Sequence, residues 1–289
     1  ASLAMGVRVK ALERSGEGFL LTGYAGERFE SRAVVLATGG LSYPGTGSTG
    51  DGYRLAQGLG HTIVPPGPAL VPLEIREREL CRAMQGLSLR NVALTVREEG
   101  RGKPVFSELG EMLFTHFGVS GPLVLSASSR MERPEEGRYS LYIDLKPGLS
   151  PEQLDARLLR DFGGQSNKNF ANALGGLLPA KLIPVVIRRS GIPPEQKVHQ
   201  VSREQRRALA ALLKDFSLTV DGFRPVEEAI VTTGGVALKE VNPKTMESKC
   251  CPGLFLAGEL LDIDGYTGGF NLQIAFSTGA AAGESVCLS

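Results

Sequence analysis

The residues best suited to chemistry lie in a polar, glycine-rich turn near the C-terminus. The turn begins at Gly258 and Glu259, directly after an apolar run, and it ends in Thr267, Gly268 and Gly269. Glycine lets a backbone approach a ligand closely because no Cβ intervenes, and bare amides at a helix N-terminus favour an anion. The turn therefore predicts an anion site, with an ordinary β-to-α loop as the alternative.

Two buried strands and one helix must position this turn. Residues 254–257 and 32–37 are short apolar runs, typical of strands buried on both faces. The second run ends in a Thr-Gly-Gly at 38–40. After Asn271 the pattern becomes helical, and small residues favour a tightly packed face. We expect that face to comprise Leu272, Ala275, Phe276, Gly279 and Ala280.

Residues 45–52 match the spacing of a dinucleotide-binding glycine fingerprint. Residues 41–44 separate them from the preceding strand, however, and no acidic strand end follows about twenty residues later, as that fingerprint requires. We interpret the segment as the start of a helix over 52–59, capped by Ser48, Thr49 or Asp51.

Between the two glycine turns the chain changes character several times. Residues 7–22 predict a β-hairpin, and the prolines of 65–68 predict an extended linker. A second hairpin is expected within 92–108. Two capping boxes, which begin at Ser150 and Ser202, predict helices with buried leucine stripes.

Three motifs together resemble a bacterial family of FAD-binding flavoproteins of the aminoacetone-oxidase or BaiN type. They are Ala-Val-Val-Leu-Ala-Thr-Gly-Gly at 33–40, Ser-Thr-Gly-Asp-Gly at 48–52, and the turn and helix start at 257–273. That family belongs to the superfamily with two dinucleotide-binding domains. The resemblance implies FAD contacts at Thr38, Gly39, Gly40, Asp51, Gly258, Glu259, Asp264, Thr267, Gly268, Gly269, Asn271 and Leu272. Glu259 is expected to order nearby backbone or ribityl hydroxyls.

The resemblance extends along the whole chain and implies an α/β plus α+β architecture. A partial Rossmann-type FAD-binding domain would comprise residues 1–66 and 229–289. An inserted cap or substrate domain would occupy 67–228, with a β-rich part at 67–148 and a helical part at 149–216. We expect the turns after Ala37 and Ala257 to converge and form half of a cradle for a riboflavin moiety.

One departure from the family pattern concerns the N-terminal βαβ unit, which carries the glycine fingerprint for the pyrophosphate. Nothing before residue 7 could be that unit. We therefore expect the chain to contact the flavin half of FAD but not the ADP half. Purified alone, it should be inactive and nearly colourless, with FAD absent or weakly bound.

Proton transfer has two candidate residues, His116 and Tyr266. His116 lies in a Thr-His-x-Gly-x-Ser-Gly-Pro segment that recurs in the resembled family, although a structural histidine at a strand-to-helix turn is the favoured interpretation. The resemblance also implies an electron donor, such as a nicotinamide, and a small-molecule substrate of unknown identity.

Composition limits the classes of partner. The 289 residues carry a net charge of +1, with 42% hydrophobic residues and no run of membrane-spanning length, so neither nucleic acid nor a membrane is expected. The four cysteines show no CxxC spacing and the three histidines are scattered, so no metal site is expected. A reducing, cytoplasmic compartment is expected.

Three functions remain open on the sequence. The first is a fragment of an FAD-dependent oxidoreductase, with the inserted domain capping the isoalloxazine ring. The second is a non-catalytic scaffold or a module that binds a small molecule or a protein. The third, a flavin-dependent RNA-modifying enzyme, is disfavoured by the neutral charge.

Overall fold

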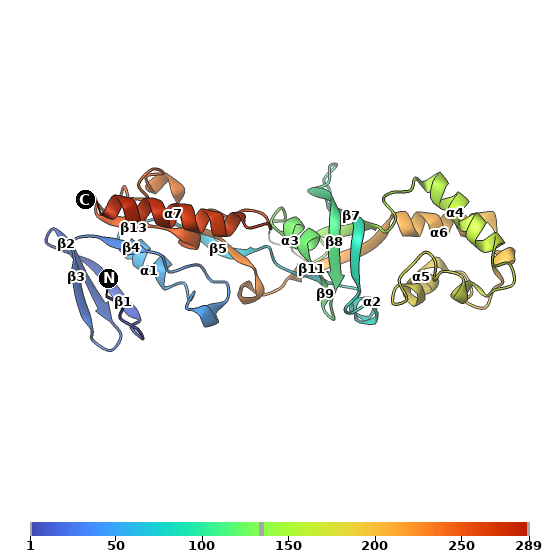
Figure 1. Cartoon of the computed structure of the whole chain (residues 1–289), viewed down its shortest axis with the longest axis horizontal. Helices are drawn as coiled ribbons and strands as arrows, with labels where there is room; N and C mark the ends of the chain where they lie inside the picture. The colour runs from blue at the N-terminus through green and yellow to red at the C-terminus, as the bar shows by residue number, and fades with distance from the viewer. Residues whose placement is uncertain (1, 133–135, 288–289) are drawn as a thin grey trace. The chain divides into compact units, whose positions relative to one another are not determined.

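The structure is a computed structural model that describes residues 2–132 and 136–287. It divides into two compact units (Figure 1). Unit 1 comprises Ala1–Val71 and Pro225–Ser289, and unit 2 comprises Pro72–Arg224. Each unit encloses its own cluster of buried hydrophobic side chains.

The described residues of unit 1 form three small sheets. An antiparallel sheet in the order β1-β2-β3 comes first, a parallel pair joins β4 to β13, and an antiparallel pair joins β5 to β12. The strands are β1 (Val9–Ser15), β2 (Gly18–Gly23), β3 (Arg28–Ser31), β4 (Val34–Leu36), β5 (Ile63–Ala69), β12 (Val231–Val236) and β13 (Leu254–Leu256). The helices are η1 (Pro44–Thr46), α1 (Asp51–Gly58), η4 (Val226–Glu228), η5 (Leu238–Glu240), η6 (Gly258–Leu260) and α7 (Phe270–Val286).

The proline-rich segment of unit 1 is a strand, so the predicted linker at 65–68 is wrong. β5 runs through Pro65, Pro66 and Pro68 and pairs antiparallel with β12. Proline cannot donate a hydrogen bond, but an edge strand needs donors on one side only. Because β12 is the one strand that pairs with β5 among the described residues, the outer side of β5 tolerates the missing amides.

Unit 2 is built around a closed six-stranded barrel in the order β10-β11-β6-β9-β8-β7. Its strands are β6 (Leu73–Ile75), β7 (Ser88–Glu98), β8 (Phe106–Phe114), β9 (Gly118–Ser120), β10 (Tyr139–Asp144) and β11 (Phe216–Phe223). Its helices are α2 (Arg78–Ala83), α3 (Pro122–Ser128), α4 (Pro151–Gly163), η2 (Phe170–Asn172), α5 (Ile183–Ser190), η3 (Val198–Gln200) and α6 (Arg203–Lys214).

The helices α4 and α6 begin where the sequence predicts them to begin. The hydroxyl of Ser150 accepts from the amide of Gln153, and that of Ser202 accepts from the amide of Gln205. Each glutamine carboxamide bonds back to the amide of its serine, which completes both capping boxes. The buried faces of α4 and α6 then join the hydrophobic core of unit 2.

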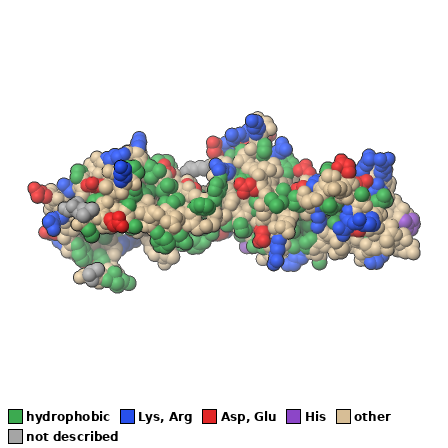
Figure 2. Space-filling view, turned by 45° about the horizontal axis from the view of Figure 1, so that its top comes forward, with side chains coloured by type: hydrophobic (Ala, Val, Ile, Leu, Met, Phe, Trp, Pro, Cys, Tyr) green, Lys and Arg blue, Asp and Glu red, His purple; other side chains and the backbone are tan. Residues whose placement is uncertain are grey.

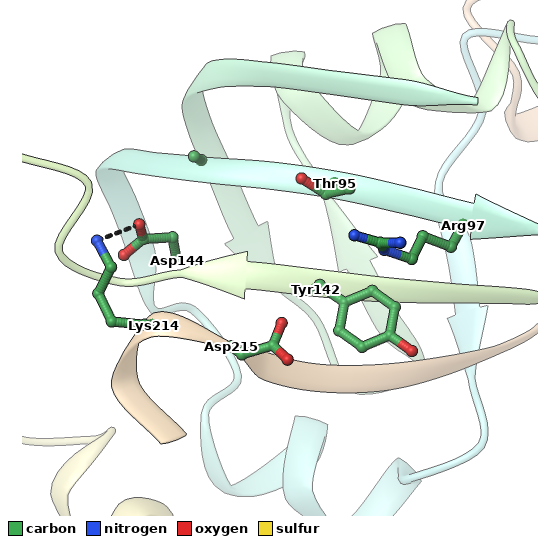
Figure 3. A pocket seen from close by; sticks show the side chains of 7 residues that line it. Thr95, Arg97, Tyr142, Asp144, Lys214 and Asp215 are labelled. Atoms are coloured by element: carbon green, nitrogen blue, oxygen red, sulfur yellow. Dashed lines mark ion pairs between the residues drawn. The ribbon is translucent and has the colours of Figure 1, made fainter. Parts of the chain in front are cut away.

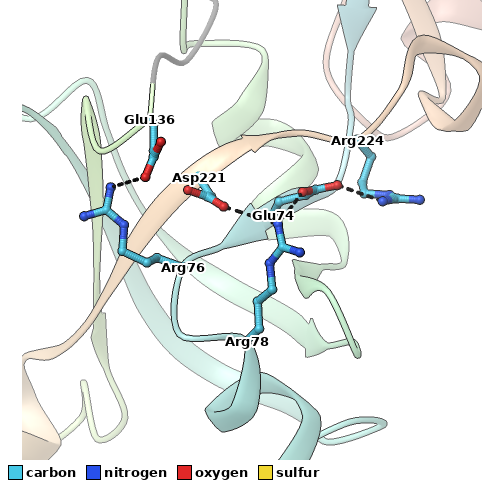
Figure 4. A network of polar contacts seen from close by, with 6 residues as sticks. All are labelled: Glu74, Arg76, Arg78, Glu136, Asp221 and Arg224. Atoms are coloured by element: carbon cyan, nitrogen blue, oxygen red, sulfur yellow. Dashed lines mark hydrogen bonds and ion pairs between the residues drawn. The ribbon is translucent and has the colours of Figure 1, made fainter.

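Charged side chains link the strands by which the chain enters and leaves unit 2 (Figure 4). Glu74 on β6 accepts from Arg224 at 2.7 Å and lies 3.3 Å from Arg78. Arg78 also lies 3.3 Å from Asp221 on β11. These groups are partly exposed, so each pair adds about 1 kcal/mol or less to stability. The network therefore contributes little to the stability of unit 2, and its main effect is to fix the position of β6 relative to β11.

The described helices include none that is both long enough and apolar enough to cross a lipid bilayer. The chain as a whole is mixed α/β, with a six-stranded barrel in unit 2.

Candidate functional site

The turns that follow β4 and β13 lie side by side in unit 1. The two strands pair in parallel, with Val34 opposite Leu254 and Leu36 opposite Leu256. The amide of Ala257 donates to the carbonyl of Leu36 at 3.0 Å, so the pairing continues to the strand ends. The predicted convergence of the two turns is therefore confirmed, because parallel strands deliver their carboxyl ends to the same edge.

Glu259 fastens the two turns to a third segment. Its Oε1 atom accepts a hydrogen bond from the amide of Thr232 on β12 at 2.6 Å. The hydroxyl oxygen of Thr232 accepts from the amide of Leu41 at 2.7 Å. A Cβ on Gly40 would lie 2.9 Å from Glu259 Oε1 and would overlap the Thr232 hydroxyl. Glycine at position 40 thus permits this close approach, and Glu259 orders backbone here.

Thr38 contributes a hydroxyl that lacks a hydrogen-bond partner among the described residues. Its Oγ1 atom is buried from solvent. The start of α1 packs directly against it, because a Cβ on Gly52 would overlap Thr38 Oγ1. Buried hydroxyls are normally paired, so an orphaned one in a glycine turn is a candidate ligand contact.

The Thr-Gly-Gly turn opens α7 with a glycine at the N-cap position. Gly268 has φ +112° and Gly269 has φ +91°, a left-handed conformation that favours glycine. Gly269 is the N-cap residue and, as a glycine, makes no side-chain cap hydrogen bond. A Cβ on Gly269 would have no atom within 4 Å, so the space beside it is open. First-turn amides in such a position can bind an anion.

Other predicted contacts are committed to the protein itself. The Asn271 carboxamide exchanges two hydrogen bonds of 2.8 Å with the backbone of Gly265, which closes the loop before α7. The hydroxyl of Thr233 donates to Asp264 at 3.0 Å. The amide of Gly258 donates to the hydroxyl of Thr278 at 2.9 Å. These hydrogen bonds fix the shape of the turn.

Asp51 is paired with Arg8, which directly precedes the N-terminal strand β1. Arg8 donates to Asp51 at 2.8 Å, and the hydroxyl of Thr49 donates to it at 3.0 Å. The hydrogen bond from Arg8 lowers the pKa of this carboxyl below its usual value. Although α1 touches Thr38, the structure pairs the Asp51 side chain with Arg8.

Two further groups near the turns have shifted pKa values. Burial, with the charge of Glu259, raises the pKa of Tyr53 to about 12. Burial, with the neighbouring charge of Asp264, raises the pKa of Asp262 above that of an ordinary aspartate. Both shifts follow from desolvation, which disfavours the charged form.

The expected packed face of α7 is wrong for its two largest residues. Leu272 is 64% exposed and Phe276 is 68% exposed, and Phe270 beside them is 60% exposed. In the described part of α7 only Ala282 is fully buried. Polar and apolar residues are not separated onto two faces of α7, so periodicity could not choose its buried face. An apolar surface therefore adjoins the glycine turns.

The two candidate proton-transfer residues belong to different units. Tyr266 lies in the loop before α7 of unit 1 and is 36% exposed. His116 lies between β8 and β9 of unit 2, where it is exposed and meets the ring of Phe117 edge-on at 5.0 Å between centroids. Neither position fixes a catalytic role.

Unit 2 carries a polar pocket that the sequence did not reveal (Figure 3). Its volume is about 330 Å³, and it is lined by Ala93, Thr95, Arg97, Tyr142, Asp144, Lys214 and Asp215. Lys214 pairs with Asp144 at 2.6 Å, and the guanidinium of Arg97 lies over the Tyr142 ring, 5.7 Å from its centroid. The pocket residues of β7 and β10 alternate along their strands, as outward-facing residues do. The sequence does not show that the barrel places these two strands next to each other and beside the end of α6.

Residues 67–231 match the family described as HI0933-like protein barrel and H2TH domain. The chain belongs to this family. Within it, the chain is 34% identical over 283 residues to a 3-dehydro-bile acid delta(4,6)-reductase of Clostridium scindens, covering 97% of the chain and 68% of that protein.

Two further relatives of this chain are ribosomal RNA dihydrouridine synthases. The Haemophilus influenzae protein is 35% identical over 260 residues, or 90% of the chain and 61% of its own length. The Escherichia coli protein is 32% identical over 253 residues, or 88% of the chain and 60% of its own length. The chain thus spans three fifths to about two thirds of these relatives. The family-level resemblance is confirmed, whereas the missing N-terminal unit stays a prediction.

The residues at the glycine turns are chemically compatible with a flavin cofactor of the kind that the family suggests. The orphaned hydroxyl of Thr38 offers a hydrogen bond, and the glycine N-cap at Gly269 offers an anion contact. The exposed apolar residues of α7 offer a surface for an aromatic ring. The kinship with a reductase independently supports an oxidoreductase.

Proposed function

We propose that this chain is part of an FAD-dependent reductase whose substrates hold a carbon–carbon double bond conjugated with a carbonyl group. The names of the relatives support this class. A 3-dehydro bile acid with delta(4,6) unsaturation and the uracil ring of uridine both present such a bond. A single flavin site could therefore reduce both kinds of substrate, because each offers a carbon–carbon double bond conjugated with a carbonyl group.

The observation that carries the proposal is the convergence of the turns after Ala37 and Ala257 around the orphaned hydroxyl of Thr38. In the proposal, unit 1 is a partial Rossmann-type domain, and its two glycine turns hold the flavin half of FAD. FAD, when bound, supplies hydride transfer. The capping of the isoalloxazine ring by unit 2 stays a prediction.

Reduction of a conjugated double bond adds a hydride at the β-carbon and a proton at the α-carbon. The proton needs a protein donor beside the substrate. We assign this role to the Oη atom of Tyr266, because this residue is partly exposed in the loop that leads into the Thr-Gly-Gly turn. His116 of unit 2 is the alternative donor.

The test uses protein expressed from the complete gene that encodes this chain. The protein is supplied anaerobically with FAD, an electron donor and a steroid 4,6-dien-3-one, and the product is analysed by mass spectrometry. We expect a mass gain of two hydrogens, and a loss of about 10²-fold in turnover for Tyr266→Phe. Tyr24→Phe is the matched control, since Tyr24 is exposed in a turn of the β1–β3 sheet. Equal turnover in both variants would exclude Tyr266 as donor.

A second substrate class, RNA, is favoured by the distribution of charge. The helical part at 149–216 holds eleven Lys and Arg but six Asp and Glu, although the whole chain is nearly neutral. Figure 2 shows Lys and Arg side chains on the surface of this part. The adjoining pocket of unit 2 offers the Tyr142 ring with Arg97 above it, a pairing that can stack on a base.

Salt-dependent binding separates the two substrate classes. If RNA is the substrate, a uridine-rich single strand should bind with an affinity that falls steeply as salt rises. Tyr142→Ala should weaken that binding by about 1–3 kcal/mol, and Tyr24→Ala should leave it unchanged. Absence of RNA binding, together with reduction of the dienone, would leave the small-molecule class alone.

A further inference from the structure

A second cluster of reactive side chains lies in unit 1, apart from the glycine turns. His61 follows α1, Glu240 ends η5, and Cys250 lies in the bend before β13. One ligand atom from each residue lies within 4.8 Å of the other two. No step of the proposed reaction uses these three side chains.

His61 has a ring nitrogen that the protein leaves unsatisfied. The side chain is fully buried, and Nδ1 has no hydrogen-bond partner among the described residues. Glu240 Oε2 lies 3.3 Å from Nδ1, yet outside hydrogen-bond geometry. A buried nitrogen without a hydrogen-bond partner is unfavourable, so a bound group at this position would relieve it.

The Nδ1 to Oε2 distance suits a shared metal ion. Two ligands that each lie about 2.0–2.1 Å from a tetrahedral zinc ion are about 3.3–3.4 Å apart. The observed separation of 3.3 Å therefore needs no rearrangement. The Cys250 thiol is exposed and can rotate toward the same point, so it can complete the set from the solvent side.

The surrounding hydrogen bonds hold two of the ligands in place. The amide of Thr62 donates to Glu240 Oε2 at 2.8 Å. The hydroxyl of Ser248 lies 2.7 Å from His61 Nε2, which leaves Nδ1 as the nitrogen that faces the cluster. The amide of Lys249 donates to the carbonyl of Glu240 at 2.8 Å and so joins the second and third ligand segments. Such outer contacts orient metal ligands.

We propose that His61 Nδ1, a carboxylate oxygen of Glu240 and the thiolate of Cys250 form a binding site for a zinc-like divalent cation. The nitrogen, oxygen and sulfur ligands are those that zinc accepts, and three protein ligands leave a fourth position for water. The bound ion joins the end of α1, the end of η5 and the entry to β13. It therefore stabilises unit 1 whether or not flavin is bound.

The test titrates untagged, metal-free protein with Zn²⁺ by calorimetry and with Co²⁺ by absorption spectroscopy. We expect one ion per chain, a thiolate-to-cobalt charge-transfer band and a higher melting temperature with zinc. Cys250→Ser should abolish the band and weaken Zn²⁺ binding at least about tenfold. The matched control is Cys287→Ser, an exposed cysteine outside the cluster, which should leave both unchanged.

Glu240→Gln distinguishes this site from a pair of adjacent thiols. The substituted carboxamide can keep an oxygen for the amide of Thr62 but lacks the negative charge, so Zn²⁺ should bind at least about tenfold more weakly. Binding that survives Glu240→Gln but is lost in both Cys250→Ser and Cys251→Ser would identify a dithiol site and overturn the proposal. Equal Zn²⁺ affinity in Cys250→Ser and Cys287→Ser would overturn it as well.

Discussion

At the scale of single residues, the hydroxyl groups of two threonines near the glycine turns contribute with opposite sign to the stability of the fold. The hydroxyl of Thr232 is buried and accepts hydrogen bonds from the amides of Leu41 and Ser42 at 2.7 and 3.1 Å. The hydroxyl of Thr38 is buried without a partner among the described residues. A buried hydroxyl that forms hydrogen bonds stabilises the fold. A buried hydroxyl without a partner destabilises it, and a ligand that bonds to this group can offset the loss.

Replacement of each threonine by valine should therefore change stability in opposite directions. We expect Thr38→Val to raise the free energy of unfolding by about 1 kcal/mol, because the orphaned hydroxyl is removed with little change of shape. Thr232→Val should lower it by about 1–3 kcal/mol, because two backbone amides lose their acceptor. Urea unfolding of both variants without flavin measures the difference. A destabilised Thr38→Val protein would show that this hydroxyl is already satisfied.

The buried side chain of His61 should make the free energy of unfolding depend on pH. Burial lowers the pKa of His61 below its ordinary value. An unfolded histidine titrates near pH ~6.5, so below that pH the unfolded chain takes up a proton that the folded chain does not. Stability should be fully present above about pH 6.5 and should fall as the pH drops from there toward the lower, folded-state pKa.

The urea midpoint between pH 8 and pH 5, with chelator present, tests this sign. The dependence of the urea midpoint on pH should become weaker in His61→Gln. It should persist in His199→Gln, since His199 is exposed. Glu240 has a lowered pKa, mainly through its hydrogen bonds to Thr62, and its contribution is lost only at more acid pH. An unchanged slope in His61→Gln would remove His61 as the cause.

At the scale of elements, the short strand β9 depends on one glycine. Gly118 lies opposite Glu74, and a Cβ there would overlap the carbonyl oxygen of Leu73 and lie 2.9 Å from the amide nitrogen of Ile75. Backbone atoms cannot move aside without breaking the β6–β9 pairing that closes the barrel. We expect Gly118→Ala to cost at least about 2 kcal/mol.

Gly102 is the control for this substitution. A Cβ at Gly102 would have no atom within 4 Å, and its φ is not positive. Gly102→Ala should change the free energy of unfolding by no more than about 0.5 kcal/mol. Chemical denaturation of both variants tests the contrast, and equal stability would contradict the close approach at Gly118.

Local patterns predicted the elements better than their assembly. The capping boxes at Ser150 and Ser202 and the apolar runs that become β4 and β13 are encoded within a few neighbouring residues. Barrel closure is not, because β6 pairs with β11 far along the chain. β5 was missed because its prolines favour an extended linker as much as an edge strand.

The sequence predicted where the backbone turns of the candidate site lie, but it did not predict the hydrogen-bond partners of the side chains there. Glycine turns and strand ends located the convergence of residues 38–40 with 257–259. The sequence could not show that Asn271 closes its own loop or that Asp51 turns toward Arg8, because both depend on tertiary hydrogen bonds. The exposed face of α7 was missed because its polar and apolar residues are not separated onto two faces, so the pattern marks no buried side.

At the scale of the whole molecule, two separate cores imply two separately folding parts. Every residue of the larger buried cluster belongs to unit 2, and every residue of the smaller one to unit 1. A fragment of residues 72–224 should therefore fold cooperatively by itself, as a domain with its own core does. Circular dichroism and urea unfolding of the fragment test this. A fragment without a cooperative transition would show that unit 2 requires unit 1.

The central claim, that the two glycine turns cradle the flavin half of FAD, is tested most directly by flavin-fluorescence quenching on this chain. We predict weak but saturable binding, with dissociation constants for riboflavin and FAD that agree within about threefold, because the residues that converge here address the part common to both. Thr38→Val should weaken both at least about tenfold, equivalent to about 1.4 kcal/mol. Absence of saturable quenching, or quenching that Thr38→Val leaves unchanged, would contradict the claim.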